Sequence, residues 1–162
     1  MTKKLLKYTV AIILRDAYDP NKILLVQRPD GSDLDGHWGF PAVTLLPGEL
    51  PEDGARRVCR EKLNCRAVPV RFIGAMYQKR NSYDILLMDI EMVLQDANES
   101  PDVTQARTEG TAYIVQKWTT DLRELMPSAL EGSCCSSIFL TDCGLLDREA
   151  WLLSLEGSSL VG

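Results

Sequence analysis

The stretch that decides the fold, residues 38–65, reads WGFPAVTLLPGELPEDGARRVCREKLNC. Its apolar first part predicts a short strand over residues 40–46, and Pro47 and Gly48 predict a turn after it. Pro51 suits the first position of a helix, and acidic residues follow it in the first turn, so we predict a helix over residues 51–63. Asn64 tolerates the left-handed conformation that ends many helices. The stretch is therefore a strand-loop-helix unit.

The predicted helix is weak in isolation. Gly54 lies in its interior and costs about 1 kcal/mol relative to alanine. Leu50 occupies the N-cap, where a serine or threonine would contribute about another 1 kcal/mol. Ala55, Cys59 and Leu63 form an apolar stripe at helical spacing. Packing of this stripe against other elements must therefore hold the helix.

The elements on either side of this unit alternate between strands and helices. In the strand over residues 83–95 we expect Leu86, Met88, Ile90, Met92 and Leu94 to face the core, with Asp89 and Glu91 on the opposite face. The other strands are predicted at residues 8–14, 22–27, 68–78 and 111–118, the other helices at residues 120–130 and 145–155, and polar loops at residues 29–38 and 96–110. This order predicts one α/β domain over residues 1–162, with a mixed sheet between helices.

Composition and charge exclude several classes of protein. The 162 residues are 45% hydrophobic and 25% charged, which is the balance of one globular domain. A formal net charge of −5 argues against a nucleic-acid-binding surface, although a small anionic ligand needs only two or three cations. No apolar run is long enough for a membrane span and the first residues lack a secretory pattern, so we expect a cytoplasmic protein with no membrane partner.

The five cysteines do not form a metal or disulfide pattern. Cys134 and Cys135 are adjacent, no pair has Cys-x-x-Cys spacing, and His37 is the only histidine. A disulfide between adjacent cysteines is strained, so we interpret all five thiols as reduced and structural.

The spacing of Glu49, Arg57 and Glu61 after Pro47-Gly48 resembles the signature of the Nudix hydrolases. The family pattern aligns without a gap from Val43 to Cys65, and the order of strands and helices agrees from about residue 7 to residue 130. The resemblance implies a Nudix-like α/β/α sandwich with a mixed sheet. Residues 133–162, which contain the predicted terminal helix, are not explained by it.

The resemblance also implies a chemistry. Nudix hydrolases cleave a nucleoside diphosphate linked to another group, with carboxylates at positions i, i+3 and i+4 of one helix holding Mg²⁺ or Mn²⁺. These positions are Val58, Glu61 and Lys62 here, so the formal charge of the trio is zero where the pattern has −3. We therefore expect weak metal binding.

Candidate roles follow from the pattern, residue by residue. Glu61 and Glu49 are the catalytic candidates, and Arg57 is expected to form a structural brace with Glu49. Metal ligands would be Glu61, the Ala42 or Val43 carbonyl, and Glu109. Arg28 and Lys62 are candidates for contacting phosphate, with pairing to Glu49 or exposure to water as the alternative for Lys62.

Other residues have two interpretations each. Asp89 and Glu91 could supply missing carboxylates, or could be solvated charges on a strand. His37 could be a general base or an exposed loop residue, and Trp38 and Phe40 could stack on a base or belong to the core.

Two functional hypotheses result. The first is a divergent pyrophosphohydrolase with a depleted metal site. The second is a non-hydrolytic, nucleotide-binding or regulatory Nudix-like module. Both predict a small-molecule, nucleotide-type ligand, and both leave a homodimer open.

Overall fold

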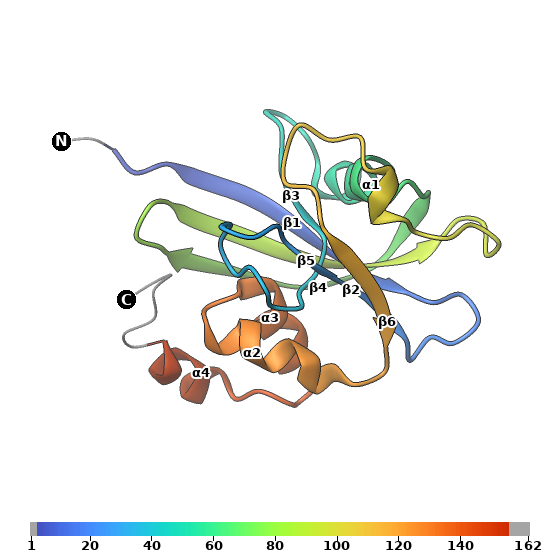
Figure 1. The fold of residues 1–162 in the computed structure, drawn as a ribbon. Helices are drawn as coiled ribbons and strands as arrows, with labels where there is room; N and C mark the ends of the chain where they lie inside the picture. Colours follow the sequence, from blue (N-terminus) through green and yellow to red (C-terminus); the bar gives the residue numbers. More distant parts are fainter. Residues whose placement is uncertain (1–2, 156–162) are drawn as a thin grey trace.

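The structure is a computed structural model that describes residues 3–155, and a six-stranded sheet lies at its centre (Figure 1). The strand order is β4-β5-β1-β2-β6, and β3 also pairs with β1. Strand β1 is parallel to β5 and every other pairing is antiparallel, so the sheet is mixed, as predicted. The strands are β1 (Leu6–Arg15), β2 (Ile23–Gln27), β3 (Ala42–Thr44), β4 (Ala67–Lys79), β5 (Asp84–Leu94) and β6 (Val115–Thr119).

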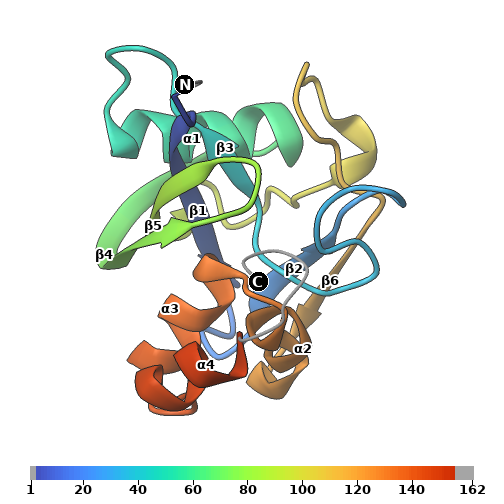
Figure 2. The same ribbon diagram turned by 90° about the vertical axis from the view of Figure 1, so that its left-hand side faces the viewer.

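Helices cover both faces of the sheet. Figure 2 shows α1 above the sheet, with α2, α3 and α4 below it. The helices are α1 (Pro51–Lys62), α2 (Met126–Leu130), α3 (Cys134–Asp142) and α4 (Arg148–Ser154), with short 3₁₀ turns η1 (Val103–Gln105) and η2 (Leu122–Leu125). The predicted α/β/α sandwich is confirmed.

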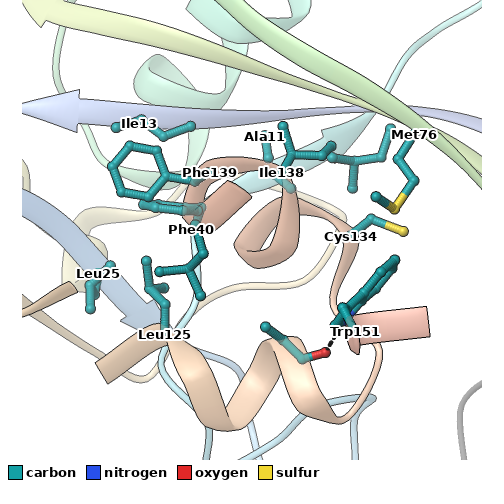
Figure 3. Close-up of a cluster of buried hydrophobic side chains, with 14 of the residues drawn as sticks. Ala11, Ile13, Leu25, Phe40, Met76, Leu125, Cys134, Ile138, Phe139 and Trp151 are labelled. Carbon is teal, nitrogen blue, oxygen red and sulfur yellow. Dashed lines mark hydrogen bonds between the residues drawn. The ribbon is translucent and has the colours of Figure 1, made fainter. Parts of the chain in front are cut away.

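Strand β1 has a buried core on each side because its side chains alternate between two layers. Val10, Ile12 and Leu14 belong to the cluster under α1. Ala11 and Ile13 belong to the second cluster, which Figure 3 shows between the sheet and the C-terminal helices. Trp151 of α4 is buried in this second cluster, and its indole Nε1 donates to the Ala129 carbonyl at 2.5 Å. Helix α4 is therefore part of the core.

Several predicted elements differ from the structure. The segment 134–142 forms α3, a helix that was not predicted. Its residues are buried on nearly every side, so the sequence lacks the helical periodicity on which prediction depends. The predicted strand 111–118 forms only at residues 115–119, and the predicted helix 120–130 divides into η2 and α2. Strand β5 buries residues on both faces, Ile85 and Leu87 on one and Ile90 and Met92 on the other, so the prediction of a single core face was wrong.

The strand-loop-helix unit forms as predicted, including both of its defects. Leu50 at the N-cap makes no side-chain cap bond, and Asn64 has the left-handed φ of 49° that ends the helix. Gly54 has a packing reason. A Cβ atom there would lie 2.3 Å from Leu45 Cδ2 and 3.2 Å from Val10 Cγ1, so glycine lets α1 approach the loop and β1 closely.

We expect Gly54→Ala to destabilise the protein by about 1 kcal/mol, although alanine is the better helix former, because the added methyl overpacks the contact with Leu45. Urea denaturation would measure the change. Arg56→Ala, on the exposed side of the same helix, is the control and should stay within about 0.5 kcal/mol of wild type. A Gly54→Ala protein more stable than wild type would show that the close approach is not needed.

Candidate functional site

A cavity of about 720 Å³ lies where α1, β3 and the start of α3 meet over β1 and β5. Thr9 and Leu87 are strand residues that line it, and Ser133 begins the α3 side. Eight of its lining residues are charged. Six are cations, Lys7, Arg28, Arg57, Lys62, Arg80 and Arg107, and two are carboxylates, Glu61 and Glu109. A protein with a formal charge of −5 therefore has a cavity suited to an anion.

Arg57 connects α1 to the loop before it. Its Nε and Nη2 atoms donate to the two Glu49 carboxylate oxygens, both at 2.9 Å, and Nη2 also donates to the Thr44 carbonyl at 2.9 Å. Glu49 further accepts from the Leu46 backbone N–H at 3.1 Å. The hydrogen bond from Arg57 lowers the pKa of Glu49, against the opposing effect of burial. This geometry is that of the expected brace.

Lys62 lies at the end of α1 and reaches across to β3. Its side chain is buried, with only 4% of the residue exposed, and Nζ donates to the Ala42 carbonyl at 2.7 Å. Neither expected alternative, pairing with Glu49 or exposure to water, is correct. Burial, reinforced by the positive charges of Arg28 and Arg57, lowers the pKa of Lys62 to about 8, while Glu61 opposes the shift.

Tyr113 shares the Ala42 backbone with Lys62. Its hydroxyl accepts from the Ala42 N–H at 2.7 Å and donates to the Ala42 carbonyl at 3.2 Å, and Lys62 Nζ lies 5.1 Å from the ring centroid. Burial raises the pKa of Tyr113 to about 12, so its hydroxyl stays protonated at neutral pH. No sequence pattern marked Tyr113, because its role depends on a loop that returns to β3.

Six of the predicted site residues line this one cavity: Arg28, Ala42, Arg57, Glu61, Lys62 and Glu109. Glu61 is half-buried and lies 3.4 Å from Arg57 Nη1, while Glu109 is exposed in the loop before β6. Glu49 is not among the lining residues. Two backbone hydrogen bonds tie the loop to the end of α1, from Arg107 N to the Glu61 carbonyl and from Asp102 N to the Leu63 carbonyl.

Asp89 and Glu91 do not lie in this cavity. Asp89 is completely buried beside α3, whose Cys135 and Asp142 are near it, and its carboxyl oxygens have no hydrogen-bond partner within residues 3–155. Burial raises the pKa of Asp89 well above its usual value. Glu91 pairs with Arg15 at 2.6 Å and Arg71 at 3.0 Å. The interpretation of Asp89 as a solvated charge was wrong, and neither residue replaces a lost carboxylate of α1.

The two aromatic candidates, Phe40 and Trp38, lie in or beside the hydrophobic core. Phe40 is buried and packs edge-on against Phe139 with ring centroids 5.2 Å apart, so its assignment to the core is correct. Trp38 packs beside the same core, with Lys117 Nζ 4.2 Å from its ring centroid. His37 is half-buried and lines a small hollow next to Arg28. All five cysteines are free thiols.

An α/β/α sandwich with a braced strand-loop-helix unit beside a cation-lined cavity defines the class of domain. A sequence profile of the NUDIX domain matches residues 5–125. The chain belongs to the Nudix family, as the resemblance of its central motif implied.

Solved structures share the fold at low sequence identity. The MutT protein of Methanosarcina mazei Go1 aligns with a TM-score of 0.63 at 17% identity, covering 93% of this chain and 99% of that one. The ORF135 protein of E. coli gives 0.58 at 22% identity, covering 76% and 79%. The NUDIX domain of Shewanella oneidensis NrtR, in complex with ADP ribose, gives 0.53 at 21% identity and covers 73% of each chain.

A search of curated protein sequences returned no match. Within residues 3–155, every helix is too short or too polar to cross a bilayer.

Nudix hydrolases generally use divalent metals such as Mg²⁺, and the oxygen atoms that line the cavity are the candidate ligands for such an ion. Hard cations need several oxygen ligands, preferably carboxylates. The Ala42 carbonyl already accepts from Lys62 and Tyr113, and the Lys62 ammonium repels a cation at this point. Among the described residues, no group of three or more histidine, cysteine, aspartate or glutamate side chains could hold a metal. This donor set does not fit a resident divalent cation.

Proposed function

We propose that this Nudix-family protein binds a nucleoside diphosphate linked to another group through cationic side chains, without a resident metal and without hydrolysing it. The observation that carries the proposal is the hydrogen bond from Lys62 Nζ to the Ala42 carbonyl, 2.7 Å long, inside the cavity. An ammonium here supplies the positive charge that a metal supplies to a diphosphate elsewhere in the family. The depleted acidic trio of α1 is then an adaptation to binding.

The electrostatics of Lys62 support an anionic ligand. Within residues 3–155, no carboxylate lies within ion-pair distance of Nζ, although the side chain is buried. Burying an unpaired charge is costly, and an anion entering the cavity would offset that cost. Arg28 and Arg107 line the same cavity and add guanidinium groups that can bind phosphate oxygens in pairs.

The ligand class has support from one structural neighbour. The NUDIX domain of NrtR was solved with ADP ribose, which is a nucleoside diphosphate joined to a sugar. We therefore place a small-molecule ligand of this kind in the cavity. A cytoplasmic location and a homodimer stay predictions.

We expect ligand affinity to be independent of Mg²⁺. Isothermal titration calorimetry with ADP-ribose and UDP-sugars, in excess Mg²⁺ and then in EDTA, should give dissociation constants equal within about threefold, because lysine and arginine neutralise the diphosphate directly. Mg²⁺ alone should bind only weakly. A ligand that binds in Mg²⁺ but not in EDTA, or a tight site for Mg²⁺ alone, would contradict the proposal.

The divergent pyrophosphohydrolase is the second candidate, and the shared cavity position of Glu61 and Glu109 favours it. Chromatography of each bound ligand after long incubation with Mg²⁺ or Mn²⁺ would detect cleavage. The proposed function predicts no product. A product whose formation is lost in Glu61→Gln would establish the hydrolase instead, with Glu52→Gln as the control on the exposed side of α1.

A further inference from the structure

The cavity has a second cationic end, away from α1. Arg80 follows the last residue of β4, is 6% exposed, and lines the cavity. Its Nε donates to Gln78 Oε1 and its Nη1 donates to the Tyr83 hydroxyl, both at 2.7 Å, while Nη2 lies 4.0 Å from Cys134 Sγ. None of these partners carries a full negative charge. Arg80 is thus a buried guanidinium without a counter-ion among residues 3–155.

The described neighbours of Arg80 neither neutralise its charge nor use all of its donors. Burial raises the pKa of the Cys134 thiol to about 12, so this thiol is not an anion at neutral pH. The guanidinium has five N–H donors, and the contacts described above use three of them. Within residues 3–155, two donors therefore have no partner and can serve a ligand, on a side chain whose conformation is already fixed by Gln78 and Tyr83.

Further positive charge collects around the same point. Lys7 Nζ lies 4.0 Å from the Tyr83 ring centroid, and Arg80 Cζ lies 5.4 Å from the same centroid. Both cations therefore lie close to one aromatic ring. Ser133 and the first two residues of α3 also line the cavity, and the start of a helix favours negative charge. Three separate elements, β1, the β4–β5 turn and α3, thus bring positive potential to one end of the cavity.

We propose that this end, formed by Arg80, Lys7 and the start of α3, is a second anion subsite. The inference rests on the proposed function and specifies its ligand: a nucleoside diphosphate whose attached group, or whose ribose, carries a further carboxylate or phosphate. The cavity volume of about 720 Å³ is sufficient for such a ligand. Lys62, Arg28 and Arg107 would contact the diphosphate, and Arg80 would contact the additional anion.

The test uses ligand pairs that differ only by one anionic group. Calorimetry would compare UDP-glucose with UDP-glucuronate, NAD with NADP, and ADP with adenosine 3′-phosphate 5′-diphosphate. Wild type should bind the more anionic member of at least one pair about tenfold more tightly, which is the usual effect of one charged hydrogen bond. Arg80→Gln should bind both members of that pair equally. Lys7→Gln, which changes the same subsite from a different strand, should reduce the preference even if Arg80→Gln fails to fold.

The control is Arg123→Gln. Arg123 is exposed on η2, so this substitution removes the same charge outside the cavity. It should keep the wild-type preference. Equal affinities within every pair in wild type, together with binding that Lys62 variants weaken, would overturn the second subsite and leave the proposed function intact. A panel in which no compound binds would overturn both. A preference that persists in both Arg80→Gln and Lys7→Gln would also reject this subsite.

Discussion

Lys62→Met is expected to abolish ligand binding and to make the ligand-free protein more stable. The pKa of Lys62 falls from 10.5 to about 8 on folding, and this difference corresponds to about 3 kcal/mol of lost stability at neutral pH. Methionine fills a similar volume without the charge, and the Tyr113 hydroxyl still satisfies the Ala42 carbonyl. Urea denaturation would measure the gain, and calorimetry would measure the loss of affinity.

The pH dependence of the same site has a defined sign. Between pH 8 and 10.5 the unfolded chain retains the Lys62 proton and the folded chain has lost it, so the stability of wild type should rise with pH relative to Lys62→Met. Ligand affinity should fall over the same range, by up to about tenfold per pH unit, because the ammonium is lost. Lys22→Met, which replaces an exposed lysine, should change neither property. If Lys62→Met lowers stability, the ammonium is a structural group.

Arg57→Ala is expected to destabilise the protein by about 2 to 3 kcal/mol and to lower its melting temperature by several degrees. The Arg57 and Glu49 side chains are 14% and 13% exposed, so the variant leaves a largely buried carboxylate without its bidentate partner. It also removes the hydrogen bond to the Thr44 carbonyl, which holds the loop against a helix that lacks a cap.

A double-mutant cycle with Glu49→Gln isolates the pair, and Arg60→Ala on the exposed face of α1 is the control. Since Arg57 lowers the pKa of Glu49, the contribution of the pair should be present above pH 4.5 and lost as the pH falls through the lowered value. An unchanged melting curve for Arg57→Ala would show that the brace is not needed for stability.

Prediction from sequence succeeded where local rules decide the structure. The helix over residues 51–62 begins with Pro51 and ends before Asn64, both of which have strong positional preferences. The alternation of strands and helices was sufficient for the α/β/α sandwich. The unfavourable Gly54 was recognised from its sequence position, but the close approach of Leu45 that explains it is a tertiary contact.

Prediction failed where a residue's environment comes from distant segments. For Lys62, pairing with Glu49 or exposure to water was the expected alternative to phosphate contact, and its actual partner is a backbone carbonyl twenty residues earlier. Asp89 alternates in sequence like a solvent-facing residue, but α3 covers it, and that helix has no amphipathic pattern by which to find it. Arg80 and Tyr113 carried no motif, because their importance depends on the cavity.

The parallel pairing of β1 with β5 has a consequence for how the protein folds. Ten consecutive pairs join Leu6 through Arg15 to Asp84 through Val93, so the central ladder connects segments almost eighty residues apart. The chain entropy lost on closing such a large loop is spent before the contacts of the ladder form, and long-range pairing of this kind slows folding. Lys7 and Thr9 of β1 and Ile85 and Leu87 of β5 all line the cavity, so this wall of the cavity is complete only when the two strands have paired. During synthesis, a ribosome-bound chain that has not yet exposed β5 therefore lacks this wall of the cavity.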